Sequence, residues 1–267
     1  MSQKFSSNAK ITIKAEREVA YESPDHLMPW GTRTDNSRNL RFNHKLYWLF
    51  PHDHIALLDL GCSGGGFVKS LLDDGHLAVG LEGSDFSKKR RRAEWATIPD
   101  FLFTCDITRD FDVLLQNGSK SEHMQFDVVT AWEVMEHIKT ADLRKLAENV
   151  KKHLKPGGLW IMSVSPNEEV INGVALHQTV QSREWWIDMF AKLGLTHVEE
   201  FNHYFNTQYV RGPKYEGPGS FHLILSTNPS KAPKIPARGL SVSSRLYDWW
   251  LGSRMQKTLR RLVVGEL

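Results

Sequence analysis

The sequence of 267 residues has only two cysteines, and it lacks any apolar run of about 18 residues, the length that a membrane-spanning helix needs. Cys62 and Cys105 cannot build a disulfide framework, so we expect a reducing, cytoplasmic location. Residues 1–10 have no apolar core, so we expect no secretory signal. The remaining composition, 40% hydrophobic and 24% charged, excludes wholesale disorder.

A large excess of one charge is also missing, because the formal net charge is +3. This small value hides an asymmetry. The tail, defined as residues 231–267, has eight Lys and Arg against Asp248 and Glu266, a net +6 that leaves −3 for the preceding residues. Nucleic-acid binding domains are usually basic, whereas residues 1–230 are mildly acidic. We therefore do not expect nucleic acid as a partner.

Short, continuous apolar runs alternate with helical patterns from about residue 55. The runs predict buried strands at residues 55–60, 77–81, 101–103, 126–131 and 159–164. The intervening patterns predict helices at residues 66–72, 85–95, 141–154 and 182–193. Residues 196–204 and 220–226, with no helix expected between them, predict a closing antiparallel hairpin. The fold class is therefore α/β, with a doubly wound, mostly parallel sheet.

We divide the chain into an N-terminal cap (1–50), a core domain (51–227) and a proline-containing linker with a basic helix (228–267). The pattern predicts one final helix at residues 243–264, amphipathic in its second half. At about 3.6 residues per turn, the two sides carry different residues. Leu251, Met255, Leu259, Leu262 and Val263 share one side, and Arg254, Lys257, Arg260 and Arg261 share the other. Two interpretations stay open: peripheral contact with an anionic membrane, or docking on the chain's own domain or a second copy.

The strongest local motif is Leu57-Leu58-Asp59-Leu60-Gly61-Cys62-Ser63-Gly64-Gly65-Gly66, directly after the first core strand. Glycines at a strand-to-helix turn let a ligand approach the backbone, and the helix N-terminus offers free N–H groups. A dinucleotide fingerprint needs glycine at its middle position, where Ser63 stands. Ser63 therefore argues against an NAD-dependent oxidoreductase, which is the alternative from a different enzyme class.

Four features follow one another along the chain. They are the pattern D-x-G-x-S-x-G, an acid that ends the second strand (Glu82), an acid after the third strand (Asp106), and the turn Lys155-Pro156-Gly157-Gly158. Residues 51–227 therefore resemble class I S-adenosylmethionine-dependent methyltransferases, which implies a Rossmann-like fold and S-adenosyl-L-methionine as cofactor. A carboxylate at Glu82 can accept both ribose hydroxyls. The cofactor-binding residues that we expect are Asp59, Gly61, Cys62, Ser63, Gly65, Glu82, Gly83, Asp106, Ile107, Trp132 and Glu133.

The fourth strand runs into Trp132-Glu133-Val134-Met135-Glu136-His137, at the sheet edge where ligands bind. If this segment is helical, Glu133, Glu136 and His137 share one face. In the first interpretation His137, with an ordinary pKa of about 6.5, is a catalytic general base and Glu136 orients its ring. In another, these residues only cap the helix and contact the cofactor.

A metal site is the remaining interpretation of this segment. The motif E-V-x-E-H resembles ubiquinone-pathway O-methyltransferases and small-RNA 3′-terminal 2′-O-methyltransferases, which implies metal use. His177, after the fifth strand, is then a candidate fourth ligand beside Glu133, Glu136 and His137. We assign no metal at this point, and the catalytic residues that we predict are His137 and Glu136.

The N-terminal residues 23–37 mix an aromatic side chain with many hydrogen-bonding ones, as a sugar site would. We therefore expect O-methylation of a small hydroxylated acceptor, such as a sugar or glycan precursor, with methylation of a nitrogen left open because a base near an amine serves equally well. Metal-assisted methylation of an RNA 2′-oxygen is the alternative within the same class. A cofactor-binding module without catalysis is a further alternative.

Overall fold

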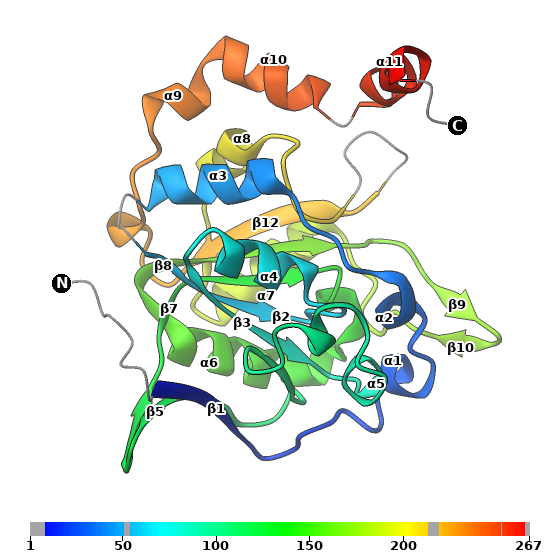
Figure 1. Cartoon of the computed structure of the whole chain (residues 1–267), viewed down its shortest axis with the longest axis vertical. Coiled ribbons are helices and arrows are strands. Elements are labelled where there is room, and N and C mark those ends of the chain that lie inside the picture. The colour runs from blue at the N-terminus through cyan, green and yellow to red at the C-terminus, as the bar shows by residue number, and fades with distance from the viewer. Residues whose placement is uncertain (1–8, 51–53, 213–218, 252, 265–267) are drawn as a thin grey trace.

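A seven-stranded sheet forms the centre of the molecule, in the order β11-β12-β8-β7-β2-β3-β4 (Figure 1). The computed structural model describes residues 9–50, 54–212, 219–251 and 253–264. The strands of this sheet are β2 (Ala56–Leu60), β3 (Leu77–Glu82), β4 (Leu102–Thr104), β7 (Phe126–Trp132), β8 (Leu154–Val164), β11 (Thr196–His197) and β12 (Phe221–Ser226).

The five strands β4, β3, β2, β7 and β8 are parallel, and β12 pairs antiparallel with both β8 and β11. Every residue of β7 is buried, as expected for a parallel strand covered on both faces. The first strand of this sheet along the chain is β2, near its middle. The chain adds β3 and β4 on one side of β2 and then β7 on the other, so the order in which strands are added reverses between β2 and β7. The predicted fold class, a doubly wound and mostly parallel sheet, is confirmed.

Helices cover both faces of the sheet (Figure 1). On one face lie α6 (Leu143–His153) and α7 (Arg183–Lys192), whose apolar residues share a core with the sheet. On the other lie α3 (Leu40–Leu49), α4 (Gly66–Asp73) and α8 (Glu199–Phe205). Side-chain caps start two of these helices: Asn39 accepts from the N–H of Arg41, and Ser182 from that of Trp185.

Two of the elements predicted for residues 51–227 differ most from the structure. The strand expected at residues 196–204 stops at His197, and the chain then forms α8, whose Phe201, Tyr204 and Phe205 fill the second core. The helix expected at residues 85–95 is instead α5 (Phe86–Lys89) followed by the 3₁₀ helix η1 (Ala93–Ala96). Left-handed backbone at Arg91 and Ala93, with φ of +48° and +47°, separates the two.

The N-terminal segment contributes β1 (Ala9–Ala15), α1 (Pro24–Leu27) and α2 (Trp30–Thr34). β1 pairs antiparallel with β5 (Phe111–Asn117), which pairs with β6 (Lys120–His123), so a three-stranded sheet extends the lower edge of the molecule in Figure 1. A short hairpin, β9 (Val170–Ile171) and β10 (Val174–Ala175), follows β8. Neither the β5–β6 hairpin nor the β9–β10 hairpin was expected from the sequence.

The C-terminal segment forms an outer layer above α3 and α8 (Figure 1). It contains η4 (Pro229–Lys231), α9 (Ala237–Leu240), α10 (Val242–Trp250) and α11 (Arg254–Val264). The prediction of one helix at residues 243–264 is wrong, because α10 ends at Trp250 and α11 begins at Arg254. Within the described residues, no helix combines the length and the apolar character required to cross a bilayer.

Candidate active site

A cavity of about 640 Å³ opens at the carboxyl ends of the parallel strands. Gly61 follows β2, Glu133 follows β7 and Ser165 follows β8, and all three line the cavity with Glu82, the last residue of β3. Helix α1 and parts of α2 supply the facing wall. The site is therefore formed where the chain direction reverses, which is where open α/β sheets bind ligands.

The glycine turn adopts left-handed backbone at three of its residues: Gly61 (φ +73°), Ser63 (φ +47°) and Gly65 (φ +84°). Ser63 thus takes a backbone conformation that glycine prefers, and the turn forms although serine stands at a position where the motif usually has glycine. Its N–H donates to Glu82 Oε2 at 2.8 Å, and the N–H of Ser84 donates to Glu82 Oε1 at 3.0 Å. Burial raises the pKa of Glu82, and these two hydrogen bonds oppose the rise.

Eight of the eleven predicted cofactor residues line the cavity: Gly61, Ser63, Glu82, Gly83, Asp106, Ile107, Trp132 and Glu133. Asp59, Cys62 and Gly65 are not among the lining residues. Asp59 accepts from the Thr130 hydroxyl at 2.6 Å, and burial raises its pKa to about 8. Cys62 is buried with its Sγ against Gly80. These three residues therefore shape the turn from within the protein.

Asp106 sits at the far end of the cavity, after β4. Its Oδ1 accepts from the N–H and the hydroxyl of Thr108, at 3.0 and 2.6 Å. Oδ2 lies 3.9 Å from the guanidinium of Arg17, which also lines the cavity. The N-terminal segment thus reaches the expected adenine end as well as the reacting end.

Glu133 does not share a helical face with Glu136 and His137, because the segment is not helical at Glu133 and the condition of that expectation is not met. The backbone at Glu133 is left-handed, with φ of +55°, and only Met135–His137 form a short 3₁₀ helix, η2. The Glu133 carboxylate accepts from the Ser220 hydroxyl and lies 3.6 Å from Arg211. Glu133 is therefore turned toward the loop before β12 and away from the histidines.

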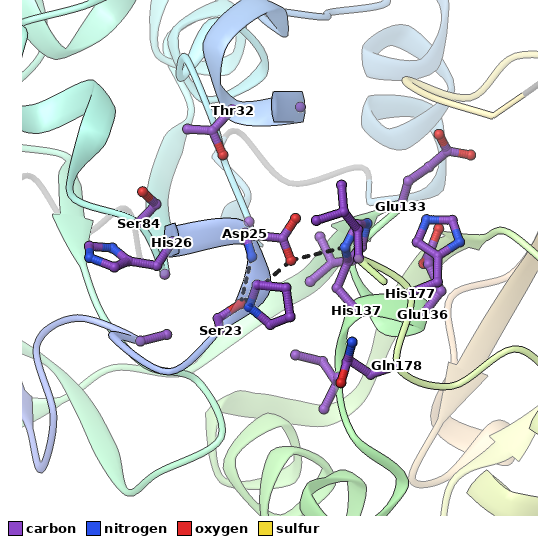
Figure 2. Close-up of a pocket in the computed structure, with 18 of the residues that line it drawn as sticks. Ser23, Asp25, His26, Thr32, Ser84, Glu133, Glu136, His137, His177 and Gln178 are labelled. Atoms are coloured by element: carbon purple, nitrogen blue, oxygen red, sulfur yellow. Dashed lines mark hydrogen bonds and ion pairs between the residues drawn. The ribbon is translucent and has the colours of Figure 1, made fainter. Parts of the chain in front are cut away.

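His137 pairs with a carboxylate from the N-terminal segment. Its Nδ1 lies 2.9 Å from Oδ2 of Asp25 on α1, and Figure 2 shows Asp25 pointing across the cavity to the ring. Ser23 caps α1 by accepting from the Asp25 N–H. Burial alone lowers the pKa of His137, but the ion pair with Asp25 and the charge of Glu136 outweigh it and raise the pKa above its ordinary value.

Glu136 is fully buried beside His137. Its Oε1 accepts from the N–H of Ser165 at 2.9 Å, while its Oε2 is buried without a hydrogen-bond partner among the described residues. Burial raises the pKa of Glu136 to about 7, against the opposing charge of His137. A buried, unsatisfied carboxyl oxygen is costly, so its retention beside two histidines is a sign of function.

His177 completes this group from the loop that follows β8. Its ring centroid lies 4.7 Å from that of His137, and ligand atoms of Glu136, His137 and His177 lie within 4.8 Å of one another (Figure 2). Nδ1 of His177 lies 2.5 Å from the backbone oxygen of Asn167, and Nε2 lies 3.3 Å from Glu169. The expected fourth ligand is therefore close to Glu136 and His137, while Glu133 is not part of the group.

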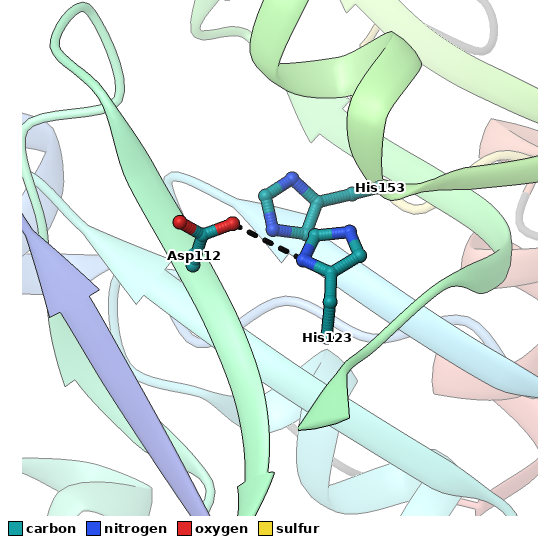
Figure 3. Close-up of side chains that lie close together, drawn as sticks. All are labelled: Asp112, His123 and His153. Atoms are coloured by element: carbon teal, nitrogen blue, oxygen red, sulfur yellow. Dashed lines mark ion pairs between the residues drawn. The ribbon is translucent and has the colours of Figure 1, made fainter. Parts of the chain in front are cut away.

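A second group of the same residue types lies outside the cavity (Figure 3). It consists of Asp112 and His123 on the β5–β6 hairpin and His153 at the end of α6. Nδ1 of His153 lies 2.8 Å from the Asn149 backbone oxygen, and Nε2 accepts from the N–H of Val113 at 3.1 Å. Because backbone groups occupy both ring nitrogens of His153, this group is a structural contact between hairpin and helix.

Asp25 is the principal residue that the sequence analysis missed, since it was treated only as part of a polar segment. Its helix start is readable from Ser23-Pro24-Asp25, an N-cap followed by proline at the first helical position. Nothing in the sequence pairs it with His137, which lies 112 positions later. Arg211, which bridges Asp35 and Glu133 at 3.7 and 3.6 Å, was also missed.

The sequence is similar to those of known methyltransferases. A family profile described as "Methyltransferase domain" matches residues 32–210. The chain is 26% identical over 124 residues to ubiquinone biosynthesis O-methyltransferase of Bartonella tribocorum, covering 46% of this chain and 47% of that protein. It is 26% identical over 160 residues to the protein of that name in Coxiella burnetii, covering 57% and 64%.

The chain thus spans about half the length of the curated relatives that it matches. Among solved structures, glycopeptide N-methyltransferase MtfA complexed with S-adenosyl-L-homocysteine aligns with a TM-score of 0.46 and 14% identity. This alignment covers 75% of this chain and 94% of that one.

Proposed function

The chain belongs to the methyltransferase domain family, and from this premise we propose that it methylates an oxygen of a small hydroxylated acceptor, with His137 as general base. The match confirms the expected class, S-adenosylmethionine-dependent methyltransferases, and it disfavours the NAD-dependent alternative. The observation that carries the proposal is the pairing of His137 with Asp25 in the same cavity as Glu82.

The donor groups of the cavity fit S-adenosylmethionine. Glu82 is held by two backbone N–H groups, and its oxygens keep lone pairs for a ribose diol. Asp106 and Ile107 line the end at which an adenine would lie, and Trp132 and Glu133 flank the end nearer His137. When bound, the cofactor supplies a methyl group already activated on a sulfonium, so the protein's main task is orientation.

His137 has the contacts of a positioned general base. Its Nδ1 lies 2.9 Å from Asp25, an ion pair that favours the proton on Nδ1, so that Nε2 can accept the proton of the acceptor hydroxyl. As the oxygen–methyl bond forms and the sulfur–methyl bond breaks, that proton moves to Nε2 and Asp25 stabilises the resulting imidazolium. Asp25 therefore acts as a positioning residue for His137.

The charge of the cavity supports a neutral acceptor over RNA. Nine carboxylate side chains and four Lys or Arg side chains line it among the described residues. A polyanionic backbone would meet net repulsion there, whereas hydroxyl groups can donate to the carboxylates. Asn167, Gln178 and Thr32 add uncharged hydrogen-bonding groups, as a polyol site requires.

Two measurements on the purified chain test this proposal. Calorimetry with S-adenosylhomocysteine should show binding that Glu82→Gln weakens about tenfold, because the amide replaces a charged diol acceptor. Mass spectrometry with an acceptor panel of sugars, phenols and RNA oligonucleotides should show one added methyl group on a small hydroxylated compound. Methylation of RNA alone would contradict the proposed acceptor class.

Metal-assisted transfer is the second candidate, favoured by the group of Glu136, His137 and His177. The buried Oε2 of Glu136 fits a ligand role. Nδ1 of His177 faces a backbone oxygen, so this histidine can ligate through Nε2 if a metal replaces the contact of Nε2 with Glu169 at 3.3 Å. A carboxylate with two imidazoles suits a divalent transition metal, which would lower the pKa of a bound hydroxyl.

The two candidates differ in their response to chelation. With His137 acting as base, extensive dialysis against EDTA should leave turnover unchanged. With a bound metal, turnover should fall and return on addition of Mn²⁺ or Zn²⁺, and His177→Ala should abolish that recovery. Calorimetric titration of the wild type with each metal measures the same difference without turnover.

A further inference from the structure

Helix α10 docks on the protein through its polar residues. Asp248 is its only buried residue within the described part of the chain, and its carboxylate pairs with Arg41 at 2.7 Å and with the fully buried Lys45. The backbone oxygen of Asp248 accepts from Thr207 at 2.8 Å and from Gln208 at 2.5 Å. These contacts fix the orientation of α10 on α3 and on the segment that follows α8.

Four of the six exposed residues of α10 have large hydrophobic side chains, and the other two are Ser243 and Arg245, so the usual arrangement of an amphipathic helix is reversed. Val242 is 73% exposed, and Val263 in α11 is 82% exposed. Among described residues, nine of thirteen exposed large hydrophobic side chains lie in α9–α11. We refer to these exposed side chains together as the outward face: Leu240, Val242, Leu246, Tyr247, Trp249, Met255, Leu259, Leu262 and Val263.

The segment that contains this outward face, residues 231–267, is strongly basic in composition. The tail has eight Lys and Arg against two acids, and one of these acids, Asp248, is already engaged with Arg41 and Lys45. α11 contains four Lys and Arg and no acid. Two copies meeting symmetrically through this face would therefore bring two strongly positive surfaces together, which disfavours self-association.

An anionic bilayer surface complements both features. Helices of 9 and 11 residues are too short to span a bilayer, but such helices lie in its interface with apolar side chains inserted. Exposed Trp and Tyr side chains prefer this interface, and Lys and Arg attract anionic headgroups. We propose that the outward face of α10 and α11 binds an anionic lipid membrane peripherally, so that the tail localises the enzyme at a membrane.

Vesicle sedimentation of the full chain tests this inference. We expect binding to phosphatidylcholine vesicles that contain a quarter phosphatidylglycerol, and at least tenfold weaker binding to pure phosphatidylcholine or in 0.5 M salt. The double variant Leu246→Glu/Leu262→Glu should lose binding at least tenfold. The single variant Leu246→Glu should weaken binding in the same direction. Its matched control, Val170→Glu, changes an aliphatic residue of similar exposure in β9, 59% against 62% for Leu246, and should bind like the wild type.

Two further measurements make the result decisive. Binding of S-adenosylhomocysteine should be the same in the double variant and the wild type, which shows that the variant is folded. Sedimentation velocity should find the wild type and the variant in the same oligomeric state. Absence of vesicle binding by the wild type, or a wild-type dimer that the double variant dissociates, would overturn the proposal.

Discussion

Two groups of histidines and a carboxylate occur among the described residues, and they differ in which atoms remain available. In the cavity, Glu136, His137 and His177 combine a carboxyl oxygen without a partner in the described structure with a ring held by the side chain of Asp25. Against α6, the ring of His153 is engaged on both nitrogens by backbone groups.

The surroundings explain this difference. The cavity group follows the ends of β7 and β8, where strands stop and side chains replace backbone partners. The other group lies between a hairpin and a helix terminus, where backbone N–H and C=O groups need partners and His153 supplies both. Proximity of ligating residue types therefore does not identify a site, whereas the availability of their atoms does.

The largest expected effect is on turnover in His137→Ala. Removing a positioned general base typically costs 10²–10⁴-fold, so kcat should fall by about that factor while the affinity for S-adenosylhomocysteine stays within about twofold. The matched variant in the other group, His123→Ala, should keep wild-type turnover. Equal turnover in wild type and His137→Ala at limiting pH would remove the assignment of His137 as base.

The second prediction concerns acid stability through His153. Burial lowers its pKa from 6.5 to about 4, with His123 and Lys152 adding to the effect and Asp112 opposing it. The unfolded chain therefore binds a proton at a higher pH than the folded one. The stabilisation is complete above pH 6.5 and is lost as the pH falls toward 4, by at most about 3 kcal/mol.

Urea unfolding across this pH range measures the effect. His153→Gln cannot titrate, so the difference in unfolding free energy between wild type and variant should shrink on acidification. His123→Gln, the matched variant on the hairpin, should keep most of the wild-type pH dependence. A difference between wild type and His153→Gln that stays constant from pH 7.5 to 4.5 would contradict this account.

The sheet was predictable because its strands are buried on both faces and read as continuous apolar runs, as β7 does. The three-stranded sheet was also readable in principle. Residues 10–14 alternate strictly, and Asn117-Gly118 is a turn signal between β5 and β6. The pairing of β1 with β5 was not, since it joins segments about a hundred residues apart.

The cavity residues also divide into those that a local sequence motif predicts and those that long-range contacts place. Gly61, Ser63 and Glu82 belong to a local motif with a fixed place at the strand ends, so the sequence identified them. Asp25 belongs to a segment whose position depends on the docking of α1 and α2, and no local pattern encodes that contact. The outward side of α10 was also unpredictable, because a buried Asp248 reverses the usual preference.

The third prediction is smaller and concerns Asp25→Asn. Loss of the carboxylate charge lowers the raised pKa of His137, so the rising limb of the profile of kcat against pH should move to lower pH. Turnover at the new optimum should fall about tenfold, because the amide orients the ring less well and does not stabilise the imidazolium. Asp25→Glu should restore part of the activity.

The control for Asp25→Asn is Asp112→Asn, which removes the carboxylate of the other group. It should leave the pH profile of turnover unchanged, because Asp112 lies outside the cavity. A profile of Asp25→Asn that coincides with the wild type would show that Asp25 only packs against His137.

The smallest expected effect is on stability in His123→Ala. The Nδ1 of His123 lies 3.1 Å from Asp112, but both side chains are about one-third exposed, and Lys152 also lies 3.1 Å from that carboxylate. Exposed ion pairs contribute about 0–1 kcal/mol, so the unfolding free energy at pH 7 should change by less than about 1 kcal/mol.

Zn²⁺ should not raise the melting temperature by binding Asp112, His123 and His153, since both ring nitrogens of His153 are already engaged by backbone groups. A stabilisation by Zn²⁺ that His123→Ala removes and His177→Ala retains would reverse the comparison, because the metal would then bind at the hairpin and not in the cavity.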